Sequence, residues 1–317
     1  HGLGEKALEI NHILIAGDYK SIFQKYLKDL KNYQLSFKSV ESITNEDLDW
    51  ADAYVGFEPC EQFKPSQVKW VHTFNAGINN YLAIDDWQTS QTLLTRTISD
   101  FGEKMSEYCL SYILADLQHH KLFEEQQDEN IWLKQSPQAL RDQTITIFGT
   151  GETGQTIAKI FSLLGMTVYG ISNSGKAKAY FKKMLPIHKA KTLVQQADYI
   201  ISTLPLTTKT EKLFNQTMFE AFDQAYFINV GRGQVVDQES LKSALNKGNV
   251  RHAVLDVFES EPLHKNSELW QRNDITITHH ISALTDLNEA VTCFYHTLKN
   301  IEHGEILENQ VDLKRGY

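Results

Sequence analysis

Short apolar runs and amphipathic segments follow one another along the first hundred residues. The runs predict strands at residues 13–16, 35–40, 53–57 and 70–74. Between the first two, apolar side chains recur at helical spacing, at Ile22, Phe23, Tyr26, Leu27 and Leu30. Strands that alternate with helices are typical of a parallel sheet covered by helices. We therefore expect an α/β domain over residues 1–98.

A longer helix is predicted over residues 101–117. Its apolar positions form one wide face, with Met105, Tyr108, Cys109, Tyr112, Ile113 and Leu117. The polar stretch 124–130 interrupts this pattern, and Pro137 with the turn at 141–143 leads to the next strand. Because the composition shifts between residues 97 and 101, we place the first domain boundary there.

The segment 144–164 reads as strand, tight turn and helix. A β-branched run at 144–147 precedes three glycines at the spacing of the dinucleotide-binding fingerprint, and an amphipathic stretch at 155–164 follows. The first glycine permits the turn, the second lets backbone amides approach a pyrophosphate, and the third lets the helix pack close to the strand. A cofactor loop is predicted at Gly149, Thr150, Gly151, Glu152, Thr153 and Gly154. A purely structural βα turn is the alternative.

The end of the following strand, predicted at residues 166–171, bears on which cofactor binds. An Asp or Glu at this point, about 20 residues after the first glycine, contacts the ribose of NAD. Here no acidic residue occurs between Glu152 and Asp198, and the position is taken by Ser172, Asn173, Ser174 and Lys176, with Lys178 close behind. Hydroxyls, an amide and lysines can hold a 2′-phosphate. NADP(H) is therefore favoured and NAD(H) possible, since these lysines could also be a solvated surface.

Polar clusters follow four further predicted strands, at residues 198–204, 225–230, 253–258 and 274–278. Another follows the strand at 70–74, at Asn75, Ala76 and Gly77. Open α/β sheets bind ligands at the carboxyl ends of their strands. We expect a site built from these clusters, although Asn75–Gly77 alone could be an ordinary turn.

Composition and charge narrow the class of protein. At 317 residues the chain is long enough for two domains. A net charge of −9 argues against nucleic-acid and membrane partners, which attract basic patches. The three scattered cysteines predict buried thiols in a reducing compartment and no metal site. The apolar run at 13–16 is too short for a signal peptide, so a cytoplasmic protein acting on a small molecule is expected.

Three residues could together reduce a 2-oxo acid. Arg232 has the planar fork that binds a carboxylate, and two flanking glycines would leave backbone room for a ligand. His280 could protonate the carbonyl oxygen, and Glu261 could raise the pKa of that imidazole. Taken singly, each has an ordinary alternative: a surface salt bridge, a histidine in the core or at the surface, or a helix-capping acid.

The order and spacing of these residues resemble the D-isomer-specific 2-hydroxyacid dehydrogenase family. The resemblance rests on Asn-Val-Gly-Arg-Gly at 229–233, Asp-Val-Phe-Glu-Ser-Glu-Pro-Leu at 256–263 and Thr-His-His-Ile at 278–281. It extends from Thr73 to about Leu287 and includes Leu204-Pro205-Leu206-Thr207 and Thr210. The run 269–285 is most similar to the glyoxylate/hydroxypyruvate reductase branch.

The resemblance implies a flavodoxin-like substrate domain (residues 1–98 and 286–317) hinged to a Rossmann domain (residues 99–285), each doubly wound, with the active site in the cleft. It implies that Arg232 binds the substrate carboxylate, that His280 donates the proton and that Glu261 orients His280. It further implies that backbone amides of the loop Asn75, Ala76 and Gly77 contact that carboxylate. Cofactor contacts are implied at Asp256, which would hold the nicotinamide carboxamide, and at Leu204, Pro205, Thr210, Val230 and Gly231. Family members commonly dimerise through the nucleotide domain, so a homodimer involving the helix 101–117 is expected.

Two departures and two rival functions stay open. His279 stands where the family usually has proline, and Thr153 replaces a usual aliphatic residue. The same arrangement could serve a D-lactate-type, phosphoglycerate or phosphite dehydrogenase. A nucleotide-sensing binding protein without activity is the other rival, although sensing needs no proton donor.

Overall fold

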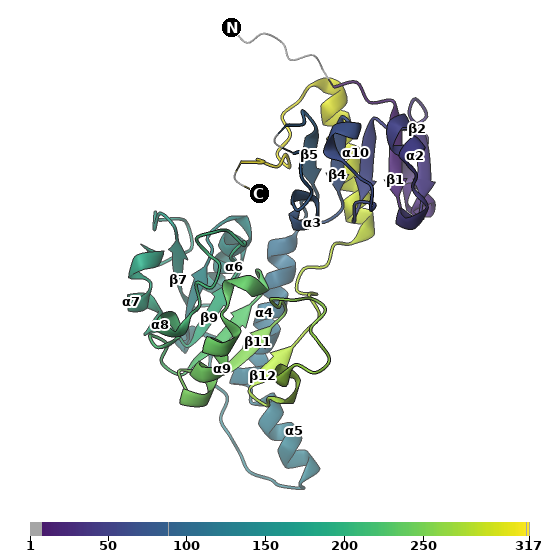
Figure 1. Ribbon diagram of the computed structural model, residues 1–317. Coiled ribbons are helices and arrows are strands. Elements are labelled where there is room, and N and C mark those ends of the chain that lie inside the picture. Colours follow the sequence, from purple (N-terminus) through teal and green to yellow (C-terminus); the bar gives the residue numbers. More distant parts are fainter. Residues whose placement is uncertain (1–7, 88, 315, 317) are drawn as a thin grey trace. The chain divides into compact units, whose positions relative to one another are not determined.

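The computed structural model describes residues 8–87, 89–314 and 316, and it divides into two compact units (Figure 1). The first unit comprises the chain up to Ser99 and from Thr285 onward, and the second runs from Asp100 to Leu284. Each unit has its own parallel sheet and its own hydrophobic core. The expected α/β class with two doubly wound sheets is confirmed.

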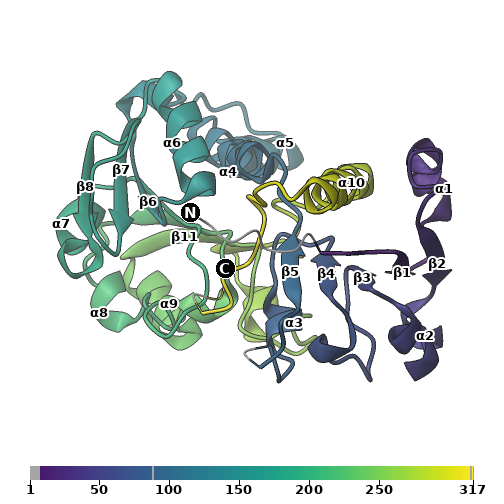
Figure 2. The ribbon, with the colours of Figure 1, turned by 90° about the horizontal axis from the view of Figure 1, so that it is seen from above.

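The first unit has a five-stranded parallel sheet in the order β2-β1-β3-β4-β5, the flavodoxin-like order. Its strands are β1 (His12–Ala16), β2 (Gln34–Lys38), β3 (Ala53–Gly56), β4 (Trp70–Thr73) and β5 (Leu93–Arg96). Helices α1 (Lys20–Phe23) and α10 (Leu287–His303) cover one face, and α2 (Asn45–Trp50) and α3 (Asn79–Leu82) cover the other (Figure 2). Because α10 comes from the end of the chain, the last residues complete the core begun by the first.

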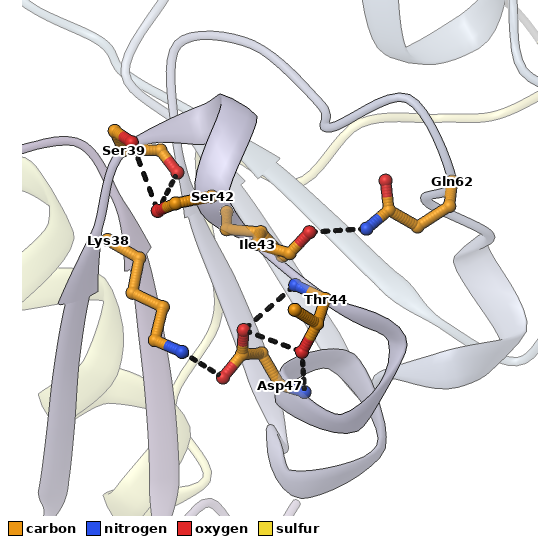
Figure 3. A network of polar contacts seen from close by, with 7 residues as sticks. All are labelled: Lys38, Ser39, Ser42, Ile43, Thr44, Asp47 and Gln62. Carbon is orange, nitrogen blue, oxygen red and sulfur yellow. Dashed lines mark hydrogen bonds and ion pairs between the residues drawn. The ribbon is translucent and has the colours of Figure 1, made fainter.

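A polar network fixes the start of α2 to the end of β2 (Figure 3). The Thr44 hydroxyl accepts a hydrogen bond from the Asp47 N–H, and the Asp47 carboxylate accepts one from the Thr44 N–H at 2.8 Å. The Lys38 ammonium lies 2.6 Å from the same carboxylate. This reciprocal cap satisfies amide groups that a helix terminus leaves without partners.

The second unit has a seven-stranded parallel sheet in the order β12-β11-β10-β9-β6-β7-β8. Its strands are β6 (Thr144–Phe148), β7 (Thr167–Ser172), β8 (Lys183–Pro186), β9 (Tyr199–Ser202), β10 (Ala225–Asn229), β11 (Val250–Leu255) and β12 (Ile275–Ile277). The strand order reverses between β6 and β9, as it does in the Rossmann fold, and ligands bind at such a switch point.

Helices cover both faces of this sheet (Figure 2). Helices α4 (Phe101–Leu117) and α6 (Glu152–Leu163) pack together on one face. The other face carries α7 (Lys191–Val194), α8 (Gln216–Phe219) and α9 (Gln238–Lys247). Single 3₁₀ turns lie at η1 (Gln24–Tyr26), η2 (Val40–Ser42), η3 (Pro65–Gln67), η4 (Leu140–Asp142), η5 (Ile187–Lys189), η6 (Gly233–Val235) and η7 (Glu268–Gln271).

The chain after α4 differs from the sequence expectation. The polar stretch 124–130 was expected to interrupt helical structure, but most of it belongs to a further helix, α5 (His120–Asp128). The break lies earlier, at His119, whose φ of 56° is left-handed. A helix with few buried side chains is polar on most positions, so a polar composition by itself does not exclude it. Residues 130–139 then continue without regular structure (Figure 1).

Candidate active site

The predicted phosphate loop joins β6 to α6 at the switch point of the second unit. Gly149 has a φ of 93°, which favours glycine. A Cβ on Gly154 would lie 1.9 Å from the Gly149 carbonyl oxygen, so only glycine permits this approach of helix to turn. Gly151 caps α6, and a Cβ there would meet nothing within 4 Å among the described residues. The loop therefore presents an open helix N-terminus, which favours anions.

The remaining residues of this loop divide into inner and outer positions. Thr150 is buried, Thr153 is half-buried and Glu152 is exposed. Thr203, which follows β9, donates its hydroxyl hydrogen to the carbonyl oxygens of Phe148 and Gly149, each at 3.1 Å. Sequence reasoning missed Thr203, because its role follows from the pairing of β6 with β9.

The carboxyl end of β7 carries hydroxyls and lysines. The Ser172 hydroxyl accepts a hydrogen bond from the Gly175 N–H at 3.0 Å, and the Ser174 hydroxyl accepts one from the Lys176 N–H. Asn173, Ser174 and Lys176 are exposed. Two predicted cofactor contacts thus also shape their own turn, which leaves the Lys176 side chain free to face a ligand.

Lys178 brings the positive charge closest to the phosphate loop. Its ammonium donates to the Thr150 carbonyl oxygen at 2.5 Å. In the sequence, Lys178 was noted only together with Lys176, as one of two lysines near the end of the predicted strand. Its particular position depends on the turn at 173–177, which sequence reasoning did not resolve.

The loop after β9 is held by Thr210. Its hydroxyl donates to the Pro205 carbonyl oxygen at 2.6 Å and accepts from the Thr207 N–H at 2.8 Å. Leu204 is buried in the core, whereas Pro205 is exposed. Of these predicted cofactor contacts, Pro205 has an accessible side chain, and Thr210 stabilises the loop.

Arg232 follows β10 in a loop that packs closely against its neighbours. A Cβ on Gly231 would lie 2.5 Å from the Leu204 carbonyl oxygen, and one on Gly233 would lie 1.8 Å from the Phe258 carbonyl carbon. The expectation that these glycines leave backbone room for a ligand is therefore wrong. The room is taken by the protein's own backbone, because three strand ends converge here. Val230 and Gly231 are buried and can offer a cofactor only backbone groups.

The Arg232 guanidinium is half-buried and charged. One of its nitrogens donates to the Gly231 carbonyl oxygen at 2.8 Å. Burial lowers the pKa of the guanidinium, and the nearby Glu261 carboxylate opposes that shift. An arginine keeps its charge despite such a shift, since its ordinary pKa lies far above neutral pH. Its remaining N–H groups can bind a carboxylate bidentately.

Glu261 and His280 form a hydrogen-bonded pair beside Arg232. Glu261 Oε2 lies 2.7 Å from His280 Nδ1, and Glu261 Oε1 accepts the Phe258 N–H at 3.0 Å. The side chains of His280 and Glu261 are 51% and 35% exposed. Because Nδ1 is bonded to the carboxylate, Nε2 is the ring atom that can reach a substrate. This arrangement has the geometry of an oriented general acid.

Asp256 lies at the end of β11 and is fully buried. Its carboxylate accepts hydrogen bonds from the Thr278 hydroxyl and from the N–H groups of Ile281 and Ser282, at 2.6 to 2.9 Å. These bonds hold the loop that carries His280. The contact of Asp256 with a nicotinamide carboxamide stays a prediction.

A cavity of about 600 Å³ opens beside the Glu261–His280 pair. Its lining is largely apolar, with Phe258, Pro262, Leu263, Trp270 and Ile277 together with Thr278 and His279. The His279 ring lies edge-on to Trp270, with ring centres 6.3 Å apart. His279, one of the two predicted departures from the sequence pattern, is thus part of the cavity wall.

The predicted substrate loop belongs to the first unit and follows β4. The Asn75 amide donates to the Phe57 carbonyl oxygen at 3.0 Å, so this side chain fastens the loop. Ala76 and Gly77 are half-buried. The Arg96 guanidinium lies 3.4 Å from the Ala76 carbonyl oxygen and brings a positive charge to the loop. Sequence reasoning missed Arg96, because strand β5, which ends there, was not predicted.

A family model supplies the deciding comparison. Residues 110–282, more than half of the chain, match the model "D-isomer specific 2-hydroxyacid dehydrogenase, NAD binding domain". The chain belongs to this family. As a D-isomer-specific 2-hydroxyacid dehydrogenase it is an NAD(P)-dependent oxidoreductase, and the second unit contains its nucleotide-binding domain.

Solved structures of other 2-hydroxyacid dehydrogenases agree over almost the whole chain. A family member from Aeromonas salmonicida is 28% identical with a TM-score of 0.85, over 96% of this chain and 100% of that one. A member from Xanthobacter autotrophicus in complex with NADPH and MES is 25% identical with a TM-score of 0.86, over 98% and 100%. A glyoxylate/hydroxypyruvate reductase from Sinorhizobium meliloti, at 23% identity, shares the fold with a TM-score of 0.83, over 97% and 100%.

Within the described residues, no group of three or more His, Cys, Asp or Glu side chains is placed to hold a metal ion. The same part of the chain contains no helix with the length and apolar character needed to cross a membrane.

Proposed function

We propose that the protein is an NADP(H)-preferring reductase of small 2-oxo acids, such as glyoxylate or hydroxypyruvate, and that it produces D-2-hydroxy acids where the product is chiral. The observation that carries the cofactor preference is the carboxylate-free end of β7, where the Lys178 ammonium lies at the phosphate loop. A 2′-phosphate would gain charge-assisted hydrogen bonds there and meet no repelling carboxylate. The related Xanthobacter structure, which contains NADPH, supports the same preference.

In this proposal three side chains have separate roles in the reaction: substrate binding, proton donation and orientation of the proton donor. Bound NADPH supplies the hydride that adds to C2 of the 2-oxo acid. Arg232 binds the substrate carboxylate and polarises the adjacent carbonyl. His280 delivers its Nε2 proton to the carbonyl oxygen, which becomes the hydroxyl. Glu261 holds the ring through Nδ1 and stabilises the imidazolium before the proton leaves.

The loop Asn75–Gly77 of the first unit would also bind the substrate. Backbone N–H groups of Ala76 and Gly77 would bind the carboxylate, and Arg96 would keep the loop electropositive. Asp256 would contact the nicotinamide carboxamide. Oxidation of D-lactate-type acids, phosphoglycerate or phosphite would use the same arrangement, so the substrate panel must include them.

The test is kcat/KM for glyoxylate and hydroxypyruvate with NADPH and with NADH. We expect a preference for NADPH of roughly tenfold or more, the size of one charge-assisted hydrogen bond. Equal or better rates with NADH would overturn the cofactor proposal and leave the reductase. If only another acid of the panel is turned over, that acid replaces glyoxylate and hydroxypyruvate as the proposed substrate. If no acid is turned over and a protein partner binds only in the presence of the nucleotide, a nucleotide sensor is favoured.

A lysine variant links the preference to the structure. We expect Lys178→Ala to raise KM for NADPH roughly tenfold and to leave KM for NADH nearly unchanged. Lys191→Ala, which removes an exposed lysine of α7 in the same unit, is the matched control. Equal effects on both nucleotides would remove Lys178 from the 2′-phosphate site.

We further propose a homodimer in which α5 and the segment after it contact a second copy. The apolar face of α4 packs within its own unit. The segment after α5 instead exposes Ile131, Trp132 and Leu133, with Trp132 93% exposed. Clustered exposed apolar side chains mark protein interfaces. Light scattering should show a dimer that Trp132→Asp disrupts, whereas Ile306→Asp, which alters another exposed apolar residue, should not.

We also propose that the enzyme is located in the cytoplasm, which is a reducing compartment. This proposal is supported by the three cysteines, because Cys60, Cys109 and Cys293 are all free thiols.

A further inference from the structure

A chain of hydroxyl groups connects helix α4 to the end of β11. The Tyr108 hydroxyl lies 2.6 Å from Thr278 Oγ1, and Thr278 Oγ1 donates to Asp256 Oδ1 at 2.6 Å. A hydroxyl has one hydrogen to donate, and carboxylate oxygens only accept. Thr278 therefore uses its hydrogen for Asp256 and accepts one from Tyr108. The direction of the chain is fixed as Tyr108 to Thr278 to Asp256.

Asp256 in turn binds three successive backbone N–H groups. Its carbonyl oxygen accepts from His280 at 2.9 Å, Oδ1 accepts from Ile281 at 2.8 Å, and Oδ2 accepts from Ser282 at 2.9 Å. His280 has a φ of 55°, which is uncommon for a residue other than glycine. Such a conformation persists when surrounding contacts over-determine it, and here Asp256 supplies them.

Burial makes this network sensitive to the loss of any member. Asp256 has no exposed surface, and Tyr108 is 9% exposed. Water cannot easily replace a lost partner at such a site, and hydrogen bonds in a low-dielectric interior strengthen one another. A change in the Tyr108 hydroxyl would thus reach the Asp256 carboxylate and the loop bound to it.

We propose that Tyr108 and Thr278 are positioning residues for His280. Their hydroxyls fix the Asp256 carboxylate, and Asp256 fixes the backbone of residues 280–282. This keeps His280 Nδ1 on Glu261 and Nε2 toward the substrate. The proposal rests on the proposed function in one respect, that His280 is the proton donor.

The kinetic test is the Tyr108→Phe variant of the full-length protein. We expect kcat for glyoxylate reduction to fall roughly tenfold, with KM for glyoxylate within twofold of the original, because the geometry of His280 is altered and Arg232, which binds the substrate, is kept. The primary isotope effect with 4-deuterated NADPH should rise, since the chemical step becomes more limiting.

Tyr199→Phe is the matched control. Tyr199 is on strand β9, and its hydroxyl donates to Asp116 Oδ2 at 2.5 Å. Asp116 lies near the C-terminal end of α4, the helix that carries Tyr108. We expect this variant to leave kcat and the isotope effect unchanged. Thr278→Val should lower kcat as much as Tyr108→Phe does, whereas Thr278→Ser, which keeps the hydroxyl, should have a kcat near that of the original protein. A protein with both Tyr108→Phe and Thr278→Val should have a kcat no lower than that of the slower single variant.

A second readout does not depend on turnover. In ¹⁵N–¹H imidazole spectra, the His280 Nδ1–H signal should shift or broaden in Tyr108→Phe and stay unchanged in Tyr199→Phe. Unchanged spectra and a kcat within twofold of the control would overturn the positioning role. A protein that reduces no 2-oxo acid but shows the spectral change would instead overturn the proposed function and keep the coupling.

Discussion

Gly151 and Gly154 stand three residues apart in one loop, yet their hydrogen atoms face different surroundings. The site of a Cβ on Gly154 is filled by the protein's own carbonyl group, whereas the corresponding site on Gly151 is open among the described residues. The fingerprint spacing predicted the close packing at Gly154 correctly, and the approach of a pyrophosphate to Gly151 stays a prediction. Sequence reasoning gave the wrong reason for Gly231 and Gly233, because convergence of strand ends cannot be seen along the chain.

Alanine variants should separate these roles. Gly151→Ala should keep the stability of the protein and weaken NADPH binding at least tenfold, because a methyl group would stand where the pyrophosphate approaches. Gly154→Ala should lower the free energy of unfolding by several kcal/mol, about the cost of overpacking at backbone. Urea unfolding and NADPH titration of both variants check this. A stable Gly154→Ala protein would contradict it.

Arg232 carries the substrate charge in the proposed reaction. Arg232→Ala should raise KM for glyoxylate by about a hundredfold and also slow turnover, because a bidentate contact and the carbonyl polarisation are lost together. Arg232→Lys should recover only part of the loss, since an ammonium cannot form the fork. Steady-state kinetics is the measurement, with Arg272→Ala as the control. Kinetics like those of the original protein would show that Arg232 does not bind the substrate.

At the scale of elements, local signals worked where they were strong. The apolar face at 101–117 predicted α4 with its observed bounds, and the strand before the fingerprint was predicted to within one residue. Strands β5 and β8 and helix α5 were not anticipated. Both strands are short, and the helix buries only Gln126, so none of the three leaves a clear apolar pattern.

The start of α2 offers a test of local stabilisation. Thr44→Ala removes the hydroxyl that accepts the Asp47 N–H and should lower the free energy of unfolding by about 1 kcal/mol. Ser42→Ala, outside the cap, is the control. Chemical unfolding of the two variants at pH 7 measures the difference. Equal decreases in the free energy of unfolding for the two variants would show that the Thr44 cap does not stabilise the helix more than an ordinary surface hydroxyl does.

At the scale of the whole molecule, each unit has a separate core, and the first contains a buried titratable group. His72 on β4 is fully buried between Trp70 and Phe74, its Nδ1 bonds to Thr95, and its Nε2 finds no hydrogen-bond partner among the described residues. Burial lowers the pKa of His72 to about 3. The native protein therefore keeps this ring neutral over the whole physiological range.

The stability of the first unit should fall in mild acid for this reason. Below pH 6.5 His72 becomes protonated in the unfolded chain, whereas in the native state it stays neutral until the pH approaches 3. Stability is thus full above pH 6.5 and is lost as the pH decreases, by about 2 kcal/mol at pH 5. Urea unfolding of His72→Asn should lack this component. His303→Asn, at an exposed histidine of the same unit, should retain it.

The sequence by itself determined the fold class, the family, the fingerprint loop and the grouping of polar residues at strand ends. These follow from periodicity and from spacing along the chain, which survive any detail of packing. Only the tertiary structure decided which hydroxyls and charges meet. Tyr108 looked like one apolar position of a helix, and Lys178 like one lysine of a pair. Their partners, Thr278 and Thr150, are far away in sequence, so the contacts exist only once the sheet has assembled.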